Sequence, residues 1–161
     1  MKISKTFLRG SSVLEITIAA ALISIGLVGI ISLATRSQRS TDFSKNNNLA
    51  TNYSYQAIDW IRDLRNTLGY DTLIYYLTED GSNPVIYCLN TNLPTTEANL
   101  KALTNSSCAI SDHIPNTLFS REISIDLSNL ASNYITAIAT TQWEGNKTYT
   151  NTLEVKLTKW Q

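Results

Sequence analysis

One stretch of the chain carries no ionisable side chain, and it restricts the possible folds more than any other feature. Residues 16–35 read ITIAAALISIGLVGIISLAT. A helix of roughly 20 such residues is long enough to cross the hydrocarbon core of a bilayer. Lys2, Lys5 and Arg9 precede this run, and Glu15 lies directly before it. Basic residues on one side predict a cytoplasmic N-terminus, with the rest of the chain outside.

Three kinds of N-terminal segment fit parts of this pattern. A conventional cleaved signal has an apolar core of about 7–15 residues followed by a small-residue site. The run 16–35 is longer, and the polar RSQRSTDF follows it, which argues against that kind. A plain single-pass anchor explains the run but not Glu15, because a carboxylate inside an apolar helix costs about 2–3 kcal/mol and usually marks function. Since Glu15 at headgroup depth would cost little, the anchor stays open as an alternative.

Residues 9–22, RGSSVLEITIAAAL, indicate a third kind of N-terminal segment. In it Glu15 is the fifth residue after Gly10. This segment resembles the prepilin signal of type IV pilins and of type II secretion pseudopilins. The resemblance implies that prepilin peptidase cuts between Gly10 and Ser11, so that the apolar helix stays in the mature protein. It also implies that Glu15 meets the first residue's amine of a neighbouring subunit. Ser11 stands where the family has a large apolar residue that undergoes N-methylation, and the family's helix proline is missing.

The spacing of these residues supports that arrangement on physical grounds. Glu15 lies four residues after Ser11, which is one turn away on the same helix face. The freed amine and the carboxylate would share one end of an otherwise uncharged helix, and pairing them removes two costly charges from an apolar medium. We therefore predict that Gly10 and Ser11 serve processing, and that Ser11 and Glu15 serve assembly.

The helix is predicted to continue well beyond the apolar run. No proline or glycine occurs between Arg36 and Leu68, and Gly69 is the expected stop, in a left-handed cap conformation. Apolar residues recur at helical spacing in this part: Leu49, Tyr53, Ala57, Trp60, Ile61, Leu64 and Leu68. Such a stripe predicts an amphipathic helix that covers an apolar surface. The segments SIGLVG and WIRDLRN further resemble minor pilins of the pilus-modification class.

After Gly69 the apolar period changes to that of strands. Residues 119–127 alternate apolar and polar side chains and are interrupted only by Arg121. Residues 134–143 are rich in β-branched and aromatic types, and a turn around Gly145 leads to a third segment, 153–158, that alternates apolar and polar side chains. We expect these three strands to form an antiparallel meander with one face on the helix stripe and the other in solvent.

A further strand is predicted at 85–89, and the polar segment 91–116 after it is predicted to be loop. Cys88 and Cys108 flank this loop, and two cysteines in an exported head favour a disulfide. Closing a loop of about 20 residues contributes roughly 3 kcal/mol. A tetrahedral metal site needs four ligands, and His113 is the only histidine, so we predict neither a metal nor a cofactor.

The sequence offers no catalytic constellation. His113 follows Ser111 and Asp112, but adjacent residues cannot supply the geometry of nucleophile, base and orienting group. There is no C-x-x-C pair and no glycine-rich phosphate loop. The 13 basic and 13 acidic residues balance, and no basic stripe is evident. We predict no enzyme activity, no small-molecule substrate and no nucleic-acid partner.

The expected fold is α+β and type IV pilin-like, with a long N-terminal helix packed on a small antiparallel sheet. The expected segments are a leader (1–10), a transmembrane and assembly helix (11–35), an amphipathic continuation (36–69) and a globular head (70–161). At this length one compact head is the limit.

The expected function is that of a minor pilin, a structural subunit of a type IV pilus or pilus-like filament. Its expected partners are other pilin subunits, prepilin peptidase, the inner-membrane assembly machinery and, before assembly, the membrane. The head is expected outside the cytoplasm and then in a surface or periplasmic filament. The alternatives are a type II secretion pseudopilin and a single-pass anchored binding domain that never polymerises.

Overall fold

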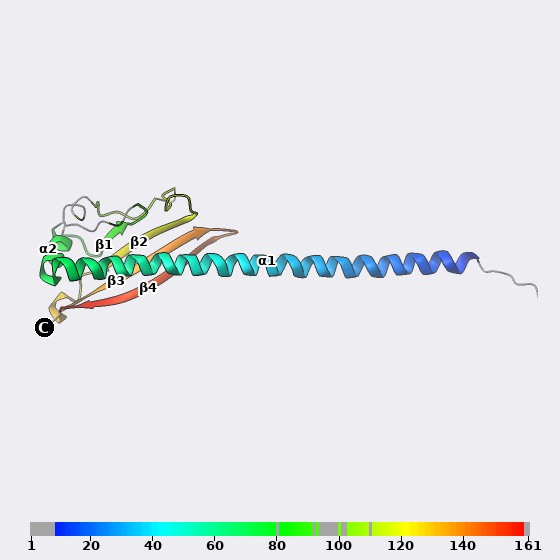
Figure 1. The fold of residues 1–161 in the computed structure, drawn as a ribbon, viewed down its shortest axis with the longest axis horizontal. Helices are drawn as coiled ribbons and strands as arrows, with labels where there is room; N and C mark the ends of the chain where they lie inside the picture. Colours follow the sequence, from blue (N-terminus) through cyan, green and yellow to red (C-terminus); the bar gives the residue numbers. More distant parts are fainter. Residues whose placement is uncertain are drawn as a thin grey trace, which may run out of the picture. The chain divides into compact units, whose positions relative to one another are not determined.

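The computed structural model describes residues 9–79, 81–91, 93, 100, 103–109 and 111–159. Most of the predicted leader therefore lies outside the described residues. The chain divides into two compact units, Met1–Ser44 and Lys45–Gln161. Helix α1, Arg9–Leu68, belongs to both units, and the second also holds a short helix and an antiparallel sheet (Figure 1). This arrangement confirms the predicted α+β class.

The first unit is helical from Arg9 onward, and its apolar side chains face outward all around the helix. The large apolar residues from Val13 to Leu33 are between 52% and 71% exposed. By length and composition this part of α1 can cross a membrane. The predicted apolar helix is thus present, and no described residue of its own unit covers its apolar surface.

The second unit is built on four antiparallel strands in chain order. These are β1 (Val85–Cys88), β2 (Phe119–Asp126), β3 (Tyr134–Glu144) and β4 (Thr148–Thr158). A turn of 3-10 helix, η1 (Leu130–Ser132), connects β2 to β3. All the predicted strands are present, and the alternating burial of β2 is the one that its sequence predicts. The β3–β4 hairpin runs without interruption from Tyr134↔Thr158 to Glu144↔Thr148.

The core of this unit lies between the C-terminal part of α1 and the inner face of the sheet. Ala57, Ile58, Ile61 and Leu64 of α1 pack there with buried residues of all four strands. The predicted apolar stripe is displaced by one position at its start, since Leu49 is 37% exposed whereas Ala50 and Ser54 are fully buried. Small side chains at these positions let the helix backbone approach the sheet closely.

Gly69 ends α1, as predicted, but not in the predicted left-handed cap. Its φ of 82° requires glycine, whereas its ψ of 154° is extended. A second helix, α2 (Tyr70–Thr78), starts at the next residue, and the sequence did not predict it. Leu73 and Leu77 are its buried residues, spaced one turn apart. In its first turn Asp71 forms an ion pair with Lys159, with Oδ1 at 2.6 Å from Nζ.

Candidate functional site

The residues predicted to act in processing and assembly lie at the start of α1. The helix includes the backbone of Gly10 and Ser11, and Glu15 follows one turn after Ser11 with an exposed side chain. The side chain of Ser11 lies outside the described part of the chain. Because the backbone from Ser11 to Glu15 is helical, the spacing that predicts their common face is present.

Most described hydroxyls of the apolar segment bond to the helix itself. Thr17 Oγ1 donates to the carbonyl of Leu14 at 2.8 Å, and Ser24 Oγ donates to that of Ala20 at 2.8 Å. Thr35 Oγ1 donates to the carbonyl of Ile31 at 2.9 Å. Such bonds satisfy polar groups without water, as an apolar medium demands. Glu15 is then the group in this segment that most needs a partner from outside.

A buried arginine joins the sheet to the helix, and the sequence pattern did not reveal it. Arg121 lies on the inward face of β2 and is 4% exposed. Its guanidinium donates to the carbonyl of Leu89 from Nη2 at 2.7 Å and to Gln56 Oε1 from Nη1 at 2.8 Å. Burial lowers the pKa of Arg121, and the Tyr53 hydroxyl group partly opposes this shift. Within the described part of the chain, no carboxylate bonds to it. The guanidinium of Arg121 therefore links α1 to the sheet instead of forming an anion-binding site, since it donates to the neutral oxygens of Gln56 and Leu89.

The predicted disulfide between Cys88 and Cys108 is present. It fixes the long loop beside β1, where Ser106 N donates to the carbonyl of Ile86 at 2.9 Å. Asn90 anchors the same loop from the other side, because its Nδ2 donates to the carbonyl of Asp112 at 2.8 Å. The loop is therefore held by covalent and polar links and also by apolar packing, because Leu100 is buried in the core and Leu93 and Leu103 pack against it.

The outer face of the sheet carries an open depression of about 430 Å³. Polar and apolar residues both line it, among them Glu122, Gln142, His113, Leu118 and Trp143. His113 and Asp112 are both exposed, and the geometry of a nucleophile and its base does not occur there. Among the residues described, no three of His, Cys, Asp or Glu gather where they could hold a metal ion. The depression thus presents a mixed polar and apolar surface, without an assembled reactive group among the described residues.

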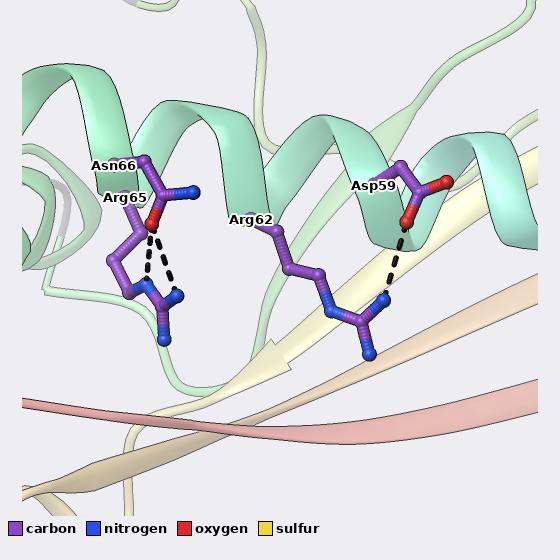
Figure 2. A network of polar contacts seen from close by, with 4 residues as sticks. All are labelled: Asp59, Arg62, Arg65 and Asn66. Atoms are coloured by element: carbon purple, nitrogen blue, oxygen red, sulfur yellow. Dashed lines mark hydrogen bonds and ion pairs between the residues drawn. The ribbon is translucent and has the colours of Figure 1, made fainter.

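The charged face of α1 consists of local, solvated pairs. Figure 2 shows Arg62 reaching towards Asp59, with Nη1 at 3.2 Å from Oδ1, and Arg65 turned towards Asn66. Arg62 and Asp59 are both exposed, so such a pair contributes about 0–1 kcal/mol. Acids alternate with bases along this face, which is the pattern of a solvated helix surface rather than of a basic groove.

Comparison of the chain with models of protein families, with curated proteins and with solved structures finds no match. The functional argument therefore rests on the residues of this chain: an apolar helix with one carboxylate near its start, and a disulfide-linked head with its own core.

Proposed function

We propose that the chain is a prepilin-type subunit, a minor pilin of a type IV pilus or of a related filament. The observation that supports this most is the exposed apolar segment of α1, which bears a single carboxylate at Glu15. An apolar surface of this extent has to be covered by lipid or by other subunits. A permanent lipid anchor needs no carboxylate at that position, whereas a helix that moves from lipid into a filament does.

Processing would prepare the chain for this move. Cleavage after Gly10 frees the amine of Ser11, and that amine pairs with Glu15 of a neighbouring subunit. Lipid tails are as apolar as the leucines and isoleucines of another helix, so leaving the bilayer gains little hydrophobic free energy. The charge pair then favours the filament over the membrane and sets how far one helix is displaced along the next. The basic leader Lys2, Lys5 and Arg9 keeps the uncleaved chain oriented.

The head would act mechanically, without substrate or cofactor. Its own core and the Cys88–Cys108 disulfide suit a domain that must stay folded outside the cytoplasm. Its partners in this role are other pilin subunits, prepilin peptidase and the membrane-embedded assembly machinery.

Mass spectrometry of the N-terminus tests the proposal. Protein is extracted from membranes and from purified filaments, and the first residue is determined in each. Ser11 is expected as the first residue of the filament fraction, and a Gly10→Leu variant should keep its leader and stay in the membrane. A retained Met1 in the wild type, or absence from filaments, would instead support an anchored domain that does not polymerise. A processed chain found only in short periplasmic fibres would point to a type II secretion pseudopilin.

A further inference from the structure

The two edges of the sheet differ in how they are covered. At the β1 edge, Asn105 Oδ1 accepts from Ile86 N at 2.9 Å, Ser106 N donates to the carbonyl of Ile86, and the disulfide holds this segment in place. Strand β4 pairs with β3 on one side, and no described segment pairs with its other side. An open edge of this length is a template for a further strand.

The sequence of the open strand is close to a palindrome. Residues 152–158 read TLEVKLT, so the same residue types recur at equal distances on both sides of Val155, apart from one exchange. That exchange places Glu154 on one side of Val155 and Lys156 on the other. Two such strands running in opposite directions, with Val155 facing Val155, would each place an acid opposite a base.

We propose that two copies of the chain associate through their β4 edges, antiparallel and centred on Val155. Glu154 of each copy then faces Lys156 of the other, and Leu153 faces Leu157. Opposite charges and apolar residues directly across an antiparallel pair are the combinations that stabilise it. The result is a single eight-stranded sheet with a two-fold axis, an isologous interface in which both copies use the same surface. This association goes beyond the proposed function, and the contact itself does not depend on it; only its place between filaments, argued below, rests on the proposed function.

The surroundings of these side chains suit such a contact. Glu154 and Lys156 are exposed on the outer face, where the Lys156 ammonium lies 5.3 Å from the ring centroid of Tyr134. Leu153 and Val155 point to the inner face and are only half-buried. A second β4 would extend the apolar inner face of the sheet beyond Leu153 and Val155. It would then cover the parts of these two side chains that are exposed in a single copy.

Proteins usually protect an open edge with proline, with a bulge or with charged side chains, lysine above all. Strand β4 contains no proline, and its pairing with β3 shows no bulge over its whole length. Its two charges near the centre, Glu154 and Lys156, have opposite signs, so antiparallel pairing about Val155 places each of them opposite the other sign in the second copy. The edge therefore has neither proline nor bulge, and its central charges attract a second copy in this register rather than repel it.

The symmetry also indicates where the contact forms. A polar filament places each subunit by the same rotation and rise, and that operation leaves no two-fold axis between neighbours. The β4–β4 contact therefore joins heads that are not neighbours in one filament, such as those of two filaments lying side by side.

Two cysteine variants of the full-length, detergent-solubilised chain test the register. Thr152 of one copy faces Thr158 of the other, at about 4.5–5.5 Å between Cα atoms, which is within the range of a disulfide. The two Thr152 residues of such a dimer lie six positions apart along the strands, or about 20 Å, and the same holds for the two Thr158 residues. Oxidation should therefore link a mixture of Thr152→Cys and Thr158→Cys chains, and should link neither variant alone. Both native cysteines are already paired, so they do not interfere. The absence of linked dimer in the mixture, or equal linking in each variant alone, overturns the proposal.

Charge exchange supplies an independent test on the same linking reaction. Added to both cysteine variants, Glu154→Lys should lower the linked fraction about tenfold, because both cross-strand pairs change from attraction to repulsion. Lys156→Glu should do the same. Combining Glu154→Lys with Lys156→Glu restores opposite charges in both pairs and should restore linking. A combined variant that links as poorly as the single ones contradicts the pairing.

Discussion

Arg121 on β2 donates a 2.8 Å hydrogen bond from Nη1 to Oε1 of Gln56 on α1. The same guanidinium donates to the carbonyl of Leu89 from Nε at 3.1 Å and from Nη2 at 2.7 Å. The main chain around it is fixed as well, because Arg121 N donates to Asn90 Oδ1 at 2.6 Å. One residue thus joins the helix, the second strand and the segment that leaves β1.

Replacing this arginine should destabilise the head strongly. Arg121→Ala removes the donors to Leu89, a buried residue, and leaves a cavity, so we expect a loss of about 2–4 kcal/mol in the free energy of unfolding. Arg121→Met, which fills more of the space and carries no charge, should lose less. Urea unfolding of the solubilised chain, followed by tryptophan fluorescence, measures both.

The matched control for this prediction is Arg62→Ala on the exposed face of α1. Arg62 makes one exposed ion pair with Asp59, so its removal should change stability by less than about 1 kcal/mol. If Arg62→Ala and Arg121→Ala lowered the free energy of unfolding equally, the buried contacts of Arg121 would stabilise the head no more than an exposed ion pair does.

Ser54 and Thr141 form a second polar link between helix and sheet. Their hydroxyl oxygens lie 2.8 Å apart, and both residues are fully buried. Ser54→Ala should lower the free energy of unfolding by about 1–3 kcal/mol, because the Thr141 hydroxyl loses its partner. Adding Thr141→Val to that variant should recover part of the loss, since no buried hydroxyl is then unpaired. A double-mutant cycle with no coupling between the two positions would refute this account.

Regular patterns in the sequence predicted most of the fold, and local context explains the rest. Alternation of apolar and polar residues predicts β2 and β4, and β-branched and aromatic content predicts β3. The lack of proline and glycine before Gly69 predicts the length of α1 beyond the apolar run. Helix α2 was missed because its tyrosines, threonines and isoleucine favour strands locally, whereas burial of Leu73 and Leu77 decides in favour of a helix.

Arg121 was predicted as an interruption of the apolar face, although it occupies an inward position of β2. Its partners, Gln56 and Leu89, lie 65 and 32 positions earlier in the chain, and only the folded structure brings them together. The disulfide could be predicted because the chain has only two cysteines. The roles of Gly10, Ser11 and Glu15 stay predictions, since they concern a peptidase and a second subunit.

The disulfide should account for a large part of the stability of the head. Cys88 and Cys108 are separated by 20 positions, so opening the link should lower the free energy of unfolding by roughly 3 kcal/mol. We expect a reductant to shift the urea midpoint of the wild type to that of a Cys88→Ala, Cys108→Ala variant. The same reductant should leave that variant unchanged. A wild-type midpoint that reductant does not move would contradict the prediction.

Asp126 should make stability depend on pH in the acid range. The Ser128 hydroxyl and the Ser128 N–H donate to Asp126 Oδ1 and lower the pKa of this carboxyl, and Asn83 adds to the effect. A carboxyl with a lowered pKa stabilises the fold above its unfolded pKa of about 3.8 and loses that effect as pH falls through its folded pKa. Ser128→Ala should raise the pKa of Asp126 in a carbon-13 NMR titration and should weaken the acid dependence of unfolding. Ser124→Ala on the same strand is the control, and an equal change in both variants would rule out the role of Ser128.

Glu15 provides the last prediction, which concerns assembly rather than stability. Because Glu15 is exposed on the first unit and belongs to no core, Glu15→Ala should leave unfolding of the head unchanged. The proposed cleavage after Gly10 should also proceed, since Gly10 lies five residues before Glu15. Incorporation into filaments should fall, because the amine of a neighbouring Ser11 would have to leave the headgroup region without an acid to meet.

The matched variants separate charge from shape at this position. Glu15→Gln keeps the size of the side chain but not its charge, whereas Glu15→Asp keeps the charge on a shorter side chain. If pairing with the amine matters, Glu15→Gln should assemble as poorly as Glu15→Ala, and Glu15→Asp should retain part of the wild-type level. Quantitative immunoblots of sheared filaments and of membranes measure the ratio. Normal incorporation of Glu15→Gln would show that the carboxylate does not select the filament over the bilayer.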